Sequence, residues 1–153
     1  MDRTETESVE LAVSAIRRSH AALAGLLLFA MSTTLMAAPA ADAARVALVK
    51  AIASHDWKSV AGLTQFPLAI EMYQAAPALT KPQFLKDPRK LSMLFGDGDK
   101  DILACVATAP LAHQGDKKQF GFDSWFADCN GNEYYFGLRG GKWLFTAYQN
   151  INE

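Results

Sequence analysis

Two carboxylates and a tyrosine in the last third of the chain are the side chains best suited to acid–base chemistry. Asp123 and Asp128 lie in an alternating segment, Lys118–Cys129, and Tyr134 follows it. A carboxyl group in an apolar pocket has a raised pKa and can exchange a proton near neutral pH. Alternation places Asp123 and Trp125 on one face of the expected strand. The other face, which we expect to be concave, carries Phe120, Phe122 and Phe126.

This orientation leaves Asp123 outside an interior cavity, and it puts Asp128 on the apolar face but at the end of the strand. No His–Asp dyad is visible at strand spacing. Asp123, Asp128 and Tyr134 are therefore candidates only, and no catalytic residue is assigned.

Large aromatic side chains are concentrated in the same region. They either form the core or line a ligand pocket, and a domain of this size needs many of them simply to fill its interior. The candidate pocket residues are Phe120, Phe122, Phe126, Phe136, Trp143 and Phe145.

The two cysteines of the chain, Cys105 and Cys129, allow a single pairing. In an exported protein this count favours one disulfide bond. A bridge closing a loop of about 25 residues stabilises a protein by roughly 3 kcal/mol. The alternative is two separate buried thiols. Both cysteines are expected on strands.

No metal site or cofactor is expected. Three acidic residues resemble the start of a calcium loop, but the positions that need Gly and Glu hold Ile102 and Thr108. His55 and His113 have no Cys, Asp or Glu at metal-ligand spacing. The acidic residues are expected to form a solvated turn: Asp97, Asp99 and Asp101.

The first 40 residues have the pattern of a secretory signal peptide. Arg17 and Arg18 precede the apolar run Ala21–Met31, and Ala38-Pro39-Ala40 supplies an A-x-A cleavage site. Cleavage after Ala43 is a second possibility. We expect a leader over residues 1–40, a single domain over 41–153, and a periplasmic or secreted location.

Two alternatives to a cleaved leader stay open, namely an uncleaved membrane anchor over Ser19–Ala41 and a buried core helix. The acidic residues at the extreme N-terminus are unusual for a leader. A start codon placed too far upstream would explain them, and sequencing of the primary translation product tests this.

The charge balance excludes whole classes of partner. The chain has 15 Lys and Arg against 16 Asp and Glu, and the part after residue 40 carries twelve of each. Nucleic-acid binders carry a basic excess. We therefore expect no nucleic acid among the partners, and contact with a membrane only through an uncleaved leader.

The chain that follows reads as helices first and strands afterwards. Helical spacing covers Asp42–His55, Asp56 can cap Trp57–Leu63, and Thr80 can cap Lys81–Lys86. Asp87-Pro88 starts a further helix that ends before Gly96-Asp97.

Phe66–Ile70 is expected to be an edge strand because it contains Pro67. Ile102–Thr108 is rich in Val and Ile and is expected to be a strand. Two hairpin turns, Asn130-Gly131 and Gly140-Gly141, separate the last strands. The order predicts an α+β fold in which N-terminal helices pack on a curved antiparallel sheet.

Three segments resemble the nuclear-transport-factor-2-like superfamily, whose fold is a cone. They are Asp56–Leu63, similar to the second helix of that superfamily, Thr80–Leu85, and the closing hairpin Tyr134–Phe145 with its Gly-Lys-Trp. The resemblance covers roughly residues 44–150. It implies a pocket inside the cone and possible dimerisation through the sheet, but no single activity.

We expect an exported, non-catalytic binding domain for a small apolar ligand or a protein. One alternative is an isomerase, dehydratase or cyclase that uses a carboxylate in the cone. The other is an immunity or inhibitor protein against a secreted effector.

Overall fold

The computed structural model describes residues 37–72, 78–115 and 123–152. The chain divides into the units Met1–Ala37 and Ala38–Glu153, and the fold described below belongs to the second. The expected leader, apart from its last residues, therefore lies outside the described residues.

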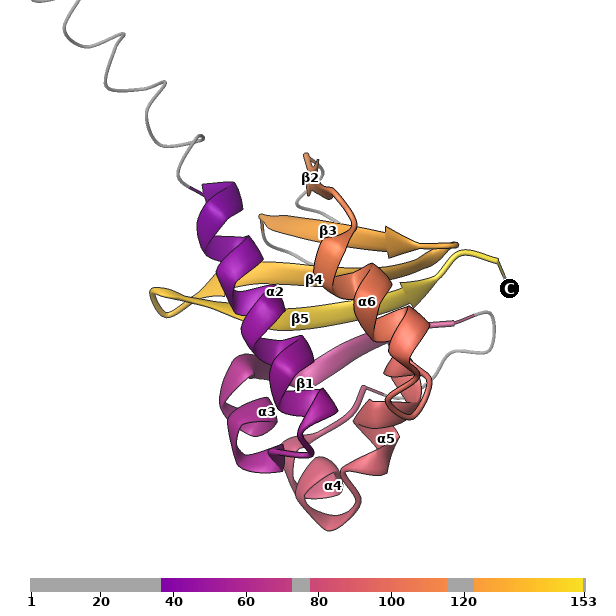
Figure 1. Cartoon of the computed structure of the whole chain (residues 1–153). Helices are drawn as coiled ribbons and strands as arrows, with labels where there is room; N and C mark the ends of the chain where they lie inside the picture. The colour runs from indigo at the N-terminus through magenta and orange to yellow at the C-terminus, as the bar shows by residue number, and fades with distance from the viewer. Residues whose placement is uncertain (1–36, 73–77, 116–122, 153) are drawn as a thin grey trace, which may run out of the picture. The chain divides into compact units, whose positions relative to one another are not determined.

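The fold is α+β, as predicted, with a five-stranded curved sheet (Figure 1). Some helices precede the first strand in the sequence, and the others lie between the first and second strands. The helical elements are α2 (Ala37–Ala53), α3 (Trp57–Leu63), α4 (Lys81–Lys86), α5 (Arg89–Ser92), the 3-10 turn η1 (Met93–Phe95) and α6 (Lys100–Thr108). The strands are β1 (Thr64–Glu71), β2 (Leu111–Gln114), β3 (Ser124–Cys129), β4 (Asn132–Arg139) and β5 (Lys142–Asn150).

The sheet is mixed, whereas we expected all of its strands to be antiparallel. The strand order is β1-β5-β4-β3-β2, and β1 pairs with β5 in parallel while the other neighbours are antiparallel. Parallel neighbours need a long crossover connection, which α4, α5 and α6 provide. β1 is an edge strand, as Pro67 predicted.

The helices α2 and α6 lie over one face of the sheet (Figure 1). Apolar side chains from these helices and from α3, α4 and η1 form one core with the helix-facing side chains of β4 and β5. Its fully buried members include Leu48, Val60, Phe84, Phe95, Val106, Phe136 and Phe145.

Local signals account for the helix starts. The Asp56 side chain accepts a hydrogen bond from the Ser59 backbone N–H at 3.1 Å. Thr80 and Gln83 form a capping box in which each side chain accepts a backbone N–H of the other. Both capped helices begin where predicted.

One predicted strand is a helix. Ile102–Thr108 belongs to α6, because the Asp99 carboxylate accepts the backbone N–H groups of Asp101 and Ile102 and so caps a helix. The buried residues Leu103 and Val106 are three apart, which is helical spacing.

Candidate functional site

The aromatic residues predicted to line a pocket divide between two faces of the sheet. Phe136 and Phe145 are fully buried in the core, with ring centroids 5.8 Å apart, and Trp143 packs against the same core. Phe126 packs instead on Tyr135, at 5.2 Å, through a pairing on the other face. Phe120 and Phe122 lie outside the described residues.

The predicted orientation of β3 is therefore wrong. Trp125, not Phe126, packs against the core beneath the helices. Alternation establishes that these neighbours point to opposite faces, but it does not tell which face the helices cover. The helix-covered face of this strand is the one that Asp123 was expected to share.

Asp123 precedes β3 and lies beside a histidine, His113. The Nε2 atom of His113 lies 2.6 Å from Oδ1 of Asp123, and the His113 ring lies 4.9 Å from that of Trp125. His113 is in β2, directly opposite Trp125 in the sheet register. The side chains of His113 and Asp123 are 42% and 50% exposed, so water reaches the pair freely.

The other two catalytic candidates have structural partners. Oδ1 of Asp128 accepts the backbone N–H of Gly131 at 2.7 Å, within the hairpin turn. The hydroxyl of Tyr134 donates to the Leu94 carbonyl at 2.7 Å and ties β4 to η1. Burial, and secondarily the neighbouring Tyr148, raises the pKa of Tyr134.

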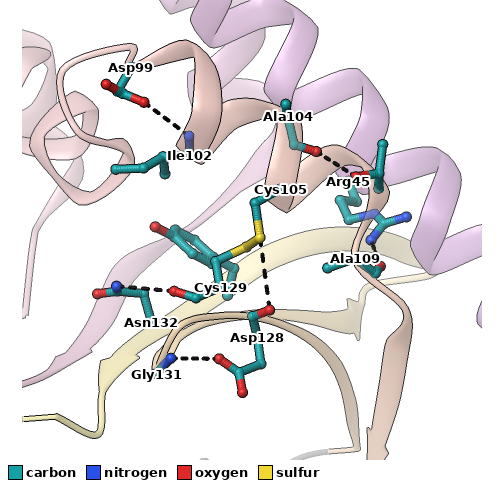
Figure 2. The surroundings of a disulfide bond; sticks show 12 residues. Arg45, Asp99, Ile102, Ala104, Cys105, Ala109, Asp128, Cys129, Gly131 and Asn132 are labelled. Atoms are coloured by element: carbon teal, nitrogen blue, oxygen red, sulfur yellow. Dashed lines mark hydrogen bonds between the residues drawn. A yellow bond between two sulfur atoms is a disulfide. The ribbon is translucent and has the colours of Figure 1, made fainter.

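The predicted disulfide bond is present and joins α6 to β3 (Figure 2). The Cα atoms of Cys105 and Cys129 are 6.0 Å apart, within the range that a bridge requires. Cys105 lies on a helix rather than a strand. The bond therefore fixes the helical layer to the sheet.

A hollow that was not predicted lies between α3 and α4. This groove has a volume of about 570 Å³. Phe84 is fully buried at its base and packs on Phe66, with ring centroids 5.4 Å apart, while Leu85 is 62% exposed. The groove is lined by Trp57, Lys58, Ala61, Gly62, Lys81, Phe84, Leu85 and Pro88.

Most of this lining is apolar, and its two charged members are both exposed lysines, Lys58 and Lys81. The ring of Trp57 is further held by an edge-on contact with His55, at 5.5 Å. The two helix caps, Asp56 and Thr80, sit at the starts of the helices that form the walls. The sequence shows each helix but not that they meet.

A second hollow, of about 400 Å³, lies between the first turns of α2 and the end of α6. Arg45 borders it and is 6% exposed. Its guanidinium donates to the carbonyl of Ala109, the residue that follows α6, and pairs with the Asp42 carboxylate. A cation at the carboxyl end of a helix is favourable.

The chain matches no known protein family, and it shows no significant similarity to a curated protein or a solved structure. Within residues 37–72, 78–115 and 123–152, no three His, Cys, Asp or Glu side chains gather as a metal site would require. In the same ranges, no helix is long and apolar enough to cross a membrane.

Proposed function

We propose that this protein is an exported domain that binds a small molecule without transforming it, in the groove between α3 and α4. The ligand has an apolar body and a negatively charged group. The observation that carries the proposal is an apolar groove of about 570 Å³ with Leu85 62% exposed beside it.

The size and lining of the groove support a small ligand. Sites for small molecules typically have volumes of about 300–1,000 Å³ and are mainly apolar, with a few polar groups that orient the ligand. Trp57, Phe84 and Leu85 supply apolar surface, and Lys58 and Lys81 supply positive charge. An amphipathic anion, such as a single-chain fatty acid, complements this combination.

Export is supported by the leader pattern and by the disulfide bond. Disulfides persist in oxidising compartments such as the periplasm and are rare in the cytosol. Cys105 and Cys129 are bonded, and the chain has no other cysteine. Membership of the nuclear-transport-factor-2-like superfamily is part of the same proposal, supported by helices on one face of a curved sheet.

Binding is tested by titrating the exported protein with laurate and with dodecanol, its uncharged counterpart. We expect Leu85→Glu to weaken laurate binding by at least about tenfold, because a carboxylate would then face the apolar chain and the ligand's own charge. Met93→Glu is the matched control, since Met93 is 65% exposed and does not line the groove. Equal loss in both variants would contradict the proposal.

The charge requirement has its own test. Lys58→Gln and Lys81→Gln should weaken binding of laurate more than that of dodecanol, while Lys90→Gln, on α5, should change neither. If the protein binds neither laurate nor dodecanol but binds a folded protein through Leu85, the proposal of a small ligand is wrong and the partner is a protein.

A catalytic role rests on a different observation, the contact between His113 and Asp123. A carboxylate beside an imidazole orients it and stabilises its protonated form, as acid–base sites require. The pair does not line either hollow. Turnover of a substrate that Asp123→Ala abolishes would overturn binding without chemistry.

A further inference from the structure

We infer that the leader is removed between Ala40 and Ala41, so that the exported chain begins at Ala41. The inference rests on the export part of the proposed function but not on the groove. The residues that follow the two possible cleavage points have different roles in the fold, and this difference selects one of them.

Ala41 belongs to the domain rather than to the leader. It lies in α2, is fully buried and is part of the hydrophobic core cluster. Ala40, its neighbour, is exposed. A cut after Ala40 therefore leaves the core complete, whereas a cut after Ala43 removes one of its members.

Asp42 has an equally specific role. It pairs with Arg45. The Arg45 side chain is buried, and its guanidinium donates to the carbonyl of Ala109 at the end of α6 (Figure 2). Within the described residues the Nε atom of Arg45 has no hydrogen-bond partner, so the Asp42 carboxylate is an important part of what balances this buried cation.

A cut after Ala43 would remove that carboxylate and place a new α-ammonium group on Ala44, the residue directly before Arg45. A buried charge that loses its partner is strongly destabilising, and a second positive charge nearby adds to the penalty. Cleavage after Ala43 would therefore weaken the contact between α2 and α6.

A cut after Ala40 has the opposite effect. Asp42 becomes the second residue of the chain, in the first turn of what remains of α2, where a negative charge is favourable. Ala38 and Ala40 provide the small residues at the third and first positions before the bond that signal peptidases require. Hydrolysis uses one water and leaves a carboxyl group on Ala40 and an amino group on Ala41.

The test is N-terminal sequencing of the mature protein after expression of the full chain in an exporting bacterial host. The expected sequence is Ala-Asp-Ala-Ala-Arg. A chain that begins at Ala44 overturns the inference and leaves export standing. A chain that retains residues 1–40 overturns the inference, and the compartment in which that uncleaved chain is found then tests export separately.

Two matched variants sharpen the result, because Ala40 and Ala43 are both exposed on α2. Ala40→Leu should abolish the product that begins at Ala41, since the residue before the bond must be small. Ala43→Leu should be processed at the same bond and at the same rate as the unaltered chain. The reverse pattern would overturn the inference.

Discussion

The aromatic cluster under the helices and the groove between α3 and α4 differ in a way that the amino-acid types alone do not reveal. Phe136 and Phe145, at the first, are fully buried and touch each other. Leu85, at the second, lies mostly in solvent beside a hollow of about 570 Å³. The aromatic side chains of the strands therefore fill the core, whereas the two short helices leave a groove between them.

The physical reason lies in the length of the elements. Long neighbouring strands present continuous rows of side chains that interdigitate with the helices above them, as close packing requires. α3 and α4 have seven and six residues, so each covers little surface. A row of aromatics thus indicates core, whereas several apolar residues that border one hollow, Trp57 and Leu85 among them, indicate a binding surface.

The largest expected effect comes from the cluster. Phe145→Ala should lower the free energy of unfolding by about 3–5 kcal/mol, because Phe145 packs against Phe95, Tyr134 and Phe136 and leaves a cavity when truncated. Leu85→Ala should change it by less than about 0.5 kcal/mol. Chemical denaturation measures both, and similar losses would remove the contrast between the two regions.

Removal of the disulfide bond should have the next largest effect. The double variant Cys105→Ser, Cys129→Ser should lose about 3 kcal/mol, since the bridge spans 24 positions and constrains the unfolded chain. Because the bond lies on the α6 side, laurate affinity at the groove should be unchanged under conditions where the variant is folded. A loss of laurate affinity in the folded variant would show that the shape of the groove depends on the bond between α6 and β3.

Much of the fold was predictable because its signals are local. Asp56 and Thr80 mark helix starts within three or four residues, and Asn130-Gly131 adopts the positive φ angles that a tight hairpin needs. β5 begins at Lys142, directly after the predicted turn at Gly140-Gly141. Each of these features requires only neighbouring residues to form.

The errors concern the pairing of one strand, one local helix cap and the packing of the helices on the sheet. β2 was not predicted, because its own short sequence does not show that it pairs with β3. The contact between His113 and Asp123 was missed for the same reason. Val and Ile content suggested a strand at Ile102–Thr108, but the Asp99 cap determined a helix. Which face of β3 lies under the helices depends on how the helices pack on the sheet. The alternation of side chains along the strand does not contain this information.

A smaller effect is expected at the cap of α4, which shapes one wall of the groove. Thr80→Ala should cost about 1 kcal/mol, because the backbone N–H of Gln83 loses its acceptor. Thr80→Ser keeps the hydroxyl and should behave as the unaltered protein. We also expect Thr80→Ala to weaken laurate binding, since Lys81 and Phe84 lie in the capped helix; an unchanged affinity would show that this wall does not need its cap.

The smallest expected effect concerns the cap of α3, on the opposite wall, and it depends on pH. Hydrogen bonds from the Ser59 side chain and backbone lower the pKa of Asp56 in the folded protein. The contribution of its charge is therefore fully present above the unfolded pKa of about 3.9 and is lost as the pH falls through the lower folded value.

Asp56→Asn retains a cap but does not titrate, which makes it the matched control for this effect. The stability advantage of the unaltered protein over Asp56→Asn should shrink on acidification from about pH 6 to about pH 3, when measured by urea denaturation at each pH. Other carboxylates titrate in both proteins and cancel in the difference. An advantage that stays constant over this range would mean that the ionised carboxylate contributes nothing to this wall of the groove.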